Sequence, residues 1–207
     1  MNYLAHALLA EPTPESRMGN VIADCLRQPD LAHLPADVVR GVMQHRAVDA
    51  FTDRHPVVHR AIARLSERWG WFTGIILDVY FDHLLAVSWD RHFPVSLGQF
   101  VFELSTDLRA TAGCLPERAA FTARWLVESG VMATYATREG ITAALVRVTH
   151  IIRRRIPERA VDLAEAMPDL TTHHEQLTDD FAEFFPQLVA RSKEWAATTP
   201  HATGRIQ

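Results

Sequence analysis

The stretch from residue 69 to residue 88, WGWFTGIILDVYFDHLLAVS, constrains the fold more than any other part of the chain. At helical spacing its apolar residues fall on every side, which predicts a helix over about 72–89 that is buried all round. The stretch has no Lys, Arg or Glu, yet it contains Asp78, Asp82 and His83. An ionised carboxylate without a partner in such surroundings is costly. We therefore expect other elements to supply a metal ion, an arginine or a histidine, although helix caps and a core histidine are the alternative.

Helical signals also dominate the rest of the chain, where no hairpin turns between alternating segments and no phosphate-binding glycine loops are found. Prolines and serines at helix starts predict about nine helices. They cover about 16–27, 35–50, 56–69, 72–89, 96–113, 116–130, 139–155, a shorter one opened by Pro157, and 169–196, which can kink at Pro186. With 207 residues, 48% of them hydrophobic, the sequence predicts a single all-α domain over 1–196 and a flexible tail over 197–207.

Bulk composition narrows the class of protein. The net charge of −4 argues against a dedicated nucleic-acid binder, which is normally basic. Two cysteines in unrelated contexts, Cys25 and Cys114, do not make a disulfide framework and fit a reducing compartment. The N-terminal residues resemble neither a signal peptide nor a membrane anchor. We expect a cytoplasmic protein without membrane insertion.

A second polar cluster is HRAVDAFTDRH over 45–55, where His45, Asp49 and Asp53 follow one another at intervals of four residues. This spacing puts them on one helical stripe, and a neutral imidazole with a carboxylate can bind one ion. A solvated face with ion pairs to Arg46 and Arg54 is the alternative, and Asp53 can also cap the next helix.

Three further residues qualify as candidates. Asp24 shares a helical face with Asn20 among apolar neighbours, although it can instead pair with a nearby arginine. His6 stands alone in an apolar segment, which more often indicates a core histidine than a ligand. His173 precedes an apolar face, and we interpret it first as a structural or supporting histidine. A helical set of His and Asp favours a hard or borderline cation such as Mn²⁺ or Mg²⁺ over a thiolate zinc site.

Arginines crowd the segment 147–159 of this acidic chain: Arg147, Arg153, Arg154, Arg155 and Arg159. Such a patch can hold phosphate or an acidic partner surface. The preference for cations at a helix C-terminus explains part of the cluster without a ligand.

At these residues the chain resembles the acyl carrier protein phosphodiesterase family. The matching stretches are MNYLAHALLA, GNVIADCLR, PADVVRGVMQHRAVDAFTD, ILDVYFDHLLAVSW and, more weakly, LTTHHEQLTDDFAEFFPQLV. The resemblance implies an HD-like helical bundle, a divergent member of the HD-type metal phosphohydrolases, that uses Mn²⁺ or a similar cation. It implies hydrolysis of the phosphodiester between 4′-phosphopantetheine and a serine of holo-acyl carrier protein, an acidic partner.

Carried over by motif, the resemblance implies a set of catalytic residues: Asp24, His45, Asp49, Asp78, Asp82 and His83. Four of these are the expected metal ligands: Asp24, His45, Asp78 and Asp82. Expected supporting residues are His6, Asn20, Arg46, Asp53 and His173, and the expected carrier-protein contacts are Arg153, Arg154 and Arg155. Two other functions remain open, namely an HD-type phosphohydrolase acting on a nucleotide or another small phosphodiester, and a carrier-protein-binding module without activity.

Overall fold

The computed structural model describes residues 1–156, 158 and 161–200 of the chain. Over these residues eleven α-helices and six 3₁₀ helices form and no strand occurs, which confirms the predicted all-α fold. The α-helices are α1 (Tyr3–Leu9), α2 (Pro14–Ile22), α3 (Ala36–Thr52), α4 (Pro56–Trp69), α5 (Thr73–Val87), α6 (Trp89–His92), α7 (Leu97–Thr111), α8 (Glu117–Ser129), α9 (Arg138–Arg155), α10 (Met167–Thr172) and α11 (His174–Thr198). The 3₁₀ helices are η1 (Ala23–Cys25), η2 (Gln28–His33), η3 (Gly70–Phe72), η4 (Ala112–Cys114), η5 (Val131–Thr134) and η6 (Leu163–Ala166).

The helix boundaries follow capping residues and prolines. Side chains of Thr13, Ser96 and Thr137 accept the N–H groups of the first turns of α2, α7 and α9, and Pro56 opens α4. The predicted helix over 169–196 is divided at His173 into α10 and α11, and α11 continues through Pro186. The predicted helix start at Pro157 and most of the predicted tail lie outside the described residues.

Two differences from the predicted elements matter for function. The first ten residues, expected only as a short apolar segment, contain helix α1. The predicted helix over 16–27 starts earlier, because Thr13 caps it and Pro14 occupies its first turn, and it ends as the 3₁₀ helix η1 at Ala23–Cys25. Asp24 consequently lies on a tight turn after the helix, not on its face.

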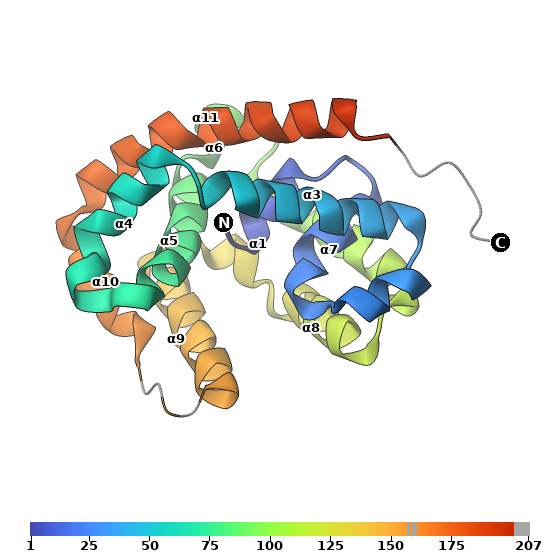
Figure 1. The fold of residues 1–207 in the computed structure, drawn as a ribbon, viewed down its shortest axis with the longest axis horizontal. Coiled ribbons are helices and arrows are strands. Elements are labelled where there is room, and N and C mark those ends of the chain that lie inside the picture. Colours follow the sequence, from blue (N-terminus) through green and yellow to red (C-terminus); the bar gives the residue numbers. More distant parts are fainter. Residues whose placement is uncertain (157, 159–160, 201–207) are drawn as a thin grey trace.

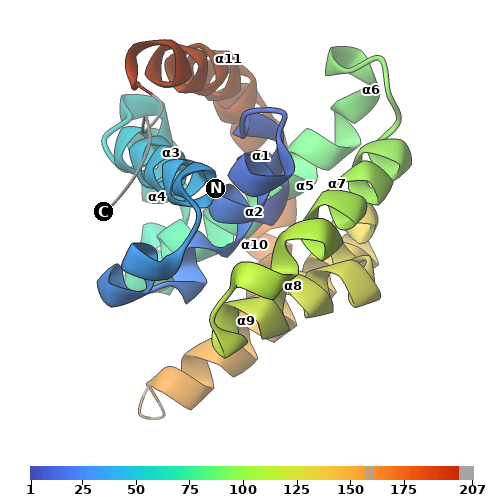
Figure 2. The same ribbon diagram turned by 90° about the vertical axis from the view of Figure 1, so that its right-hand side faces the viewer.

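Helix α5 lies in the interior, as predicted, with buried side chains from Thr73 to Ala86. Figure 1 shows α11 running along one edge of the molecule beside α3 and α4, while α1 lies in the middle. Figure 2 shows α7, α8 and α9 gathered on the other side. The stretch Pro56–Val87 would be long and apolar enough to cross a membrane by length and composition, but 56% of its most apolar window is buried within the fold. This burial is that of helices packed in a protein core.

Helices α2 and α3 pack with their backbones in close approach. A Cβ atom on Gly19 would lie 2.1 Å from the carbonyl oxygen of Val38, and one on Gly41 would lie 2.4 Å from that of Ser16. Only glycine fits at these two positions. The crossing places the end of α2 directly against the middle of α3.

Candidate active site

Two helices bring three side chains to one point. His6 comes from α1, and His45 and Asp49 come from α3, one helical turn apart. Ligand atoms of these three residues all lie within 4.8 Å of one another. His6 Nε2 is 3.1 Å from Asp49 Oδ1, and His45 Nε2 is 3.0 Å from Asp49 Oδ2. The two imidazole rings stack at a centroid distance of 3.8 Å. We call these three residues the His–Asp cluster.

A backbone contact fixes the orientation of His45. Its Nδ1 atom lies 2.8 Å from the carbonyl oxygen of Asn20, so Nδ1 carries the hydrogen and donates it. Nε2 then faces Asp49 and also Asp24, whose Oδ1 is 3.4 Å away. This is the arrangement in which a histidine offers a lone pair to a metal ion while its other nitrogen is held from behind.

Asp82 holds the helix that carries His6. Its two carboxylate oxygens accept the N–H groups of Leu4 and Ala5 at 2.8 and 3.1 Å. These donors lie in the first turn of α1, where N–H groups lack partners within the helix and the helix dipole favours an anion. The fully buried Asp82 therefore fixes α1, and with it His6, against α5.

The two histidines of the cluster have different pKa values and therefore different protonation states at pH 7. Burial lowers the pKa of His6 to about 4, so this ring is neutral at pH 7. Burial acts in the same direction on His45, but the hydrogen bonds that the ring donates to the carboxylates of Asp24 and Asp49 outweigh it and raise the pKa to about 9. Burial opposes ionisation of Asp49, yet its bonds to the two histidines hold its pKa well below the usual range. The hydrogen bond from His45 likewise lowers the pKa of Asp24.

The donor set of the cluster suits a divalent cation. Nε2 of His6 and Nε2 of His45 are both buried, and both approach the one carboxylate of Asp49. Two imidazole nitrogens and a carboxylate oxygen converging on one point are ligands that borderline divalent metals accept. A divalent metal site at the His–Asp cluster is therefore supported.

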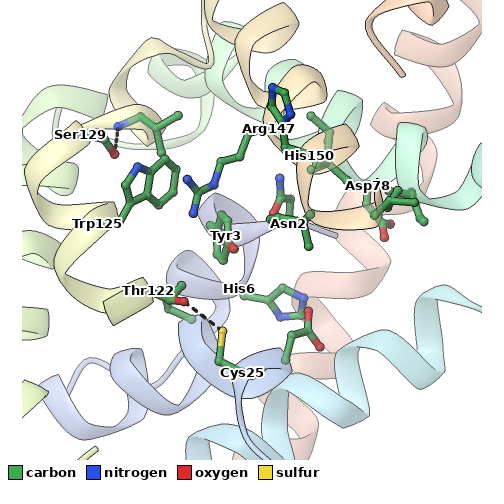
Figure 3. Close-up of a pocket in the computed structure, with 18 of the residues that line it drawn as sticks. Asn2, Tyr3, His6, Cys25, Asp78, Thr122, Trp125, Ser129, Arg147 and His150 are labelled. Carbon is green, nitrogen blue, oxygen red and sulfur yellow. Dashed lines mark hydrogen bonds between the residues drawn. The ribbon is translucent and has the colours of Figure 1, made fainter. Parts of the chain in front are cut away.

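The cluster forms one end of a pocket of about 890 Å³. His6, Asp24, His45 and Asp78 line this end, and α1 also contributes Tyr3 to the lining. The opposite wall comes from α8 and α9 and carries Trp125 and Arg147 (Figure 3). The lining also contains four arginines from α8 and α9: Arg118, Arg147, Arg154 and Arg155. The carboxylates of the described lining thus lie at the cluster, and its arginines come from the opposite wall.

The three candidates on the buried helix α5 make different contacts. Asp78 lines the pocket, but its Oδ1 lies 2.8 Å from the Met1 ammonium nitrogen. Asp82 is engaged with α1 and is not among the pocket-lining residues. His83 Nδ1 donates to the carbonyl oxygen of Tyr135 at 2.7 Å, and burial lowers the pKa of its ring. Of the three, only Asp78 is exposed to the pocket.

The predicted supporting residues also lie in different parts of the structure. Asn20 acts on His45 through its backbone, whereas the exposed residues Arg46 and Asp53 lie outside the cluster and the pocket lining. His173 lines a separate pocket of about 330 Å³ beside Arg64 and Asp169.

The C-terminal arginines take different positions. Arg154 and Arg155 line the main pocket and Arg153 does not, while Arg159 lies outside the described residues.

The structure places His6, predicted as a supporting residue, within the His–Asp cluster, and it adds a wall of the pocket that no sequence motif marks. A single ionisable side chain within an apolar N-terminal segment was the available signal for His6. Nothing in the sequence pattern singled out Tyr3, Arg118 or Trp125 as pocket residues. Their association depends on contacts between segments more than ninety residues apart, such as the bond from Arg118 to the carbonyl oxygen of Cys25.

The fold and the site together define a class: all-helical proteins with a buried His–Asp cluster at one end of a deep pocket. The family model described as acyl carrier protein phosphodiesterase matches residues 1–188. The acyl carrier protein phosphodiesterase of Photorhabdus laumondii is 30% identical over 93% of this chain and 96% of its own length. That of Serratia proteamaculans is 31% identical, with coverage of 94% and 98%. No solved structure matches significantly.

The chain therefore belongs to the acyl carrier protein phosphodiesterase family, which confirms the resemblance drawn from the sequence. Its class of activity, a phosphodiester hydrolase, is that of the family. This removes the non-catalytic module from the open alternatives.

Proposed function

We propose that the chain removes 4′-phosphopantetheine from holo-acyl carrier protein by hydrolysing the phosphodiester to the carrier serine, with Mn²⁺ held at the His–Asp cluster. The observation that carries the proposal is the convergence of the buried Nε2 atoms of His6 and His45 on the carboxylate of Asp49, in a member of this family. When bound, such a cation would polarise a phosphoryl oxygen and lower the pKa of a neighbouring water molecule.

The residues around the cluster have distinct tasks in this proposal. His6, His45 and Asp49 hold the cation, and the carbonyl oxygen of Asn20 keeps Nε2 of His45 pointed at it. Asp24 faces the pocket with 86% of its side chain exposed and a lowered pKa. As a carboxylate at neutral pH it accepts a hydrogen bond from the attacking water and orients it, which is more fitting than proton abstraction for so weak a base.

The basic side of the pocket suits an acidic macromolecular substrate. Arg154 and Arg155 line the pocket beyond the cluster, and Arg153 lies beside them in the last turn of α9. Opposite charges across such an interface favour encounter and fix orientation. We place the reaction in the cytoplasm, which is consistent with the unpaired thiols of Cys25 and Cys114.

Mass spectrometry of the carrier protein tests the proposal directly. Purified holo-acyl carrier protein incubated with this protein and Mn²⁺ should lose the mass of the phosphopantetheine group, and EDTA should prevent the loss. His45→Ala and Asp49→Asn should each abolish the reaction while the helical circular dichroism stays unchanged.

A matched control is Asp53→Asn, which removes a carboxylate one turn beyond Asp49 on an exposed part of the chain. It should retain activity and metal binding. Retention of the phosphopantetheine group with every divalent cation tested would refute the proposed reaction, and full activity of His45→Ala would refute the site.

A further inference from the structure

Arg147 occupies an unusual position on the wall opposite the His–Asp cluster. It extends from α9, and its guanidinium carbon lies over the indole ring of Trp125 from α8, 3.0 Å from the ring centroid. Figure 3 shows the guanidinium group between the Trp125 ring and Tyr3 of α1, inside the pocket. The side chain therefore bridges the space between the outer helices and the helix that carries His6.

The charge of Arg147 is not balanced within the described part of the protein. No ion pair or hydrogen bond engages its guanidinium group there, and its Nε atom is buried without a partner. The groups that act on it electrostatically are Tyr3, Tyr135 and Cys25, and none of them is a carboxylate. By contrast, Arg17 has Asp107 as its partner. Burial lowers the pKa of Arg147, which shows the cost of keeping this cation partly out of water.

Stacking on Trp125 explains only part of this arrangement. A cation–π contact uses the face of the guanidinium plane. The five N–H groups point outward within that plane and are the ones that bind carboxylate or phosphate in pairs. A rigid aromatic support with free N–H edges is what a bidentate anion site requires.

The position of Arg147 relative to the cluster indicates which anion fits. Both line the same pocket, and Figure 3 shows Tyr3 between Arg147 and His6. A phosphate group near the cluster can thus face the guanidinium group across Tyr3. The same wall also carries apolar lining residues, among them Val131, Ala143 and Val146, and these suit an uncharged arm attached to the phosphate.

We infer that Arg147 is a phosphate-binding residue, supported by Trp125, that holds the phosphoryl oxygens of the phosphopantetheine group during binding and after cleavage. The inference rests on the proposed function for the identity of the ligand. It predicts that the affinity of the pocket for the arm depends on its phosphate, and that this dependence requires Arg147.

Isothermal titration calorimetry with two ligands separates this role from a structural one. 4′-Phosphopantetheine and pantetheine, which lacks the phosphate, are titrated into the protein with EDTA present. Wild-type protein should bind 4′-phosphopantetheine more tightly. Arg147→Gln should weaken that binding by about 10- to 100-fold and change pantetheine binding less than about twofold. Arg147→Lys should fall in between, because a lysine keeps the charge and loses the planar fork.

Arg124→Gln is the matched control, because Arg124 precedes Trp125 on α8 but is exposed and does not line the pocket. It should bind both ligands as the wild type does. Equal weakening of both ligands by Arg147→Gln would show a structural role and overturn the inference, as would wild-type protein that does not distinguish the ligands or binds neither. Thermal unfolding verifies that the variants are folded. If Arg147→Gln does not fold, the binding of the two ligands to Arg147→Lys decides between the two roles.

The two proposals can fail separately. If Arg147→Gln hydrolyses holo-acyl carrier protein as the wild type does, and binding does not depend on the phosphate, the role of Arg147 is refuted and the proposed function stands. Phosphate-dependent binding without hydrolysis of the carrier protein would remove the proposed function and keep the anion site.

Discussion

At the scale of single residues, protons and metal ions compete for His45. The same nitrogen, Nε2, faces Asp24 and Asp49, and these carboxylates raise the pKa of the ring to about 9. In metal-free protein at pH 7 the position is therefore occupied by a proton. A cation must displace that proton, whereas His6, with a pKa of about 4, is already neutral.

Metal affinity should accordingly rise with pH. Below a pKa of about 9, the fraction of His45 that is unprotonated increases about tenfold per pH unit, so the apparent affinity for Mn²⁺ should do the same between about pH 6 and 8.5 and level off above 9. At pH 7 about one proton should be released per cation bound. Calorimetry in buffers of different ionisation enthalpy measures both quantities. A pH-independent affinity without proton release would contradict this account.

Asp82 should influence the metal site without touching the ion. Asp82→Asn replaces one acceptor oxygen by an NH₂ group that faces the N–H donors of α1, so it should lower the free energy of unfolding by about 1–3 kcal/mol. Mn²⁺ affinity should also fall, because His6 is no longer held in register. Urea unfolding and Mn²⁺ titration measure the two effects.

The comparison for this substitution is Asp90→Asn on the exposed part of α6, which should change the unfolding free energy by less than about 0.5 kcal/mol. An Asp82→Asn protein with wild-type stability and metal affinity would show that the bonds to α1 are unimportant.

The site residues show what burial arguments can predict. The carboxylates of the apolar helix α5 require partners, because burying an unpaired charge is costly. For Asp82 the alternative of a helix cap holds in place of a metal, an arginine or a histidine. Which helix is capped could not be predicted, because the N–H groups of Leu4 and Ala5 belong to a helix almost eighty residues away. His45 and Asp49 were predictable together since their spacing lies within one helix. His6 joins them only through the docking of α1.

At the scale of elements, the crossing of α2 and α3 sets the geometry of the site. It brings the carbonyl oxygen of Asn20, on α2, to His45 on α3. The crossing is close because Gly19 and Gly41 lack side chains. A methyl group at either position would separate the two helices and move the backbone that orients His45.

Gly19→Ala should therefore lower the free energy of unfolding by at least about 3 kcal/mol, since its Cβ would lie 2.1 Å from a backbone oxygen. Gly74→Ala is the matched control within α5, because its Cβ would meet nothing within 4 Å. It should raise stability by up to about 1 kcal/mol through better helix propensity. Chemical denaturation compares the two variants. Equal effects of the two substitutions would mean that the close crossing does not limit stability.

The helices themselves were largely predictable because their boundaries are marked locally. A proline at the start of α4 and of α8, and the capping residue Ser96 at the start of α7, suffice to place these helices. Local sequence patterns are less informative where an element depends on distant contacts. Helix α1 has seven residues and no side-chain cap, and it is held by Asp82 of α5, so a local pattern could not reveal it.

At the scale of the whole molecule, the net charge and the pocket have opposite signs. The chain carries a net charge of −4 and should repel an acidic carrier protein at long range. Arg118, Arg154 and Arg155 nevertheless line the pocket, and the carboxylates among the described lining residues, Asp24 and Asp78, are at the cluster. Attraction is thus local to the side of the pocket away from the cluster, and it can act only over about a Debye length.

Catalytic efficiency with holo-acyl carrier protein should therefore depend on salt in a way that a small substrate does not share. We expect kcat/KM to fall by about tenfold between roughly 20 and 200 mM NaCl, because screening removes the attraction of Arg154 and Arg155 for the carrier protein. Bis(p-nitrophenyl) phosphate, with a single charge, should show a much smaller change.

The double variant Arg154→Gln/Arg155→Gln should lose most of the salt dependence through a higher KM. The charge-matched variant Arg54→Gln/Arg109→Gln, at exposed positions outside the pocket lining, should keep it. If both double variants show the same salt dependence, the overall surface charge attracts the carrier protein, and the position of Arg154 and Arg155 at the pocket does not matter.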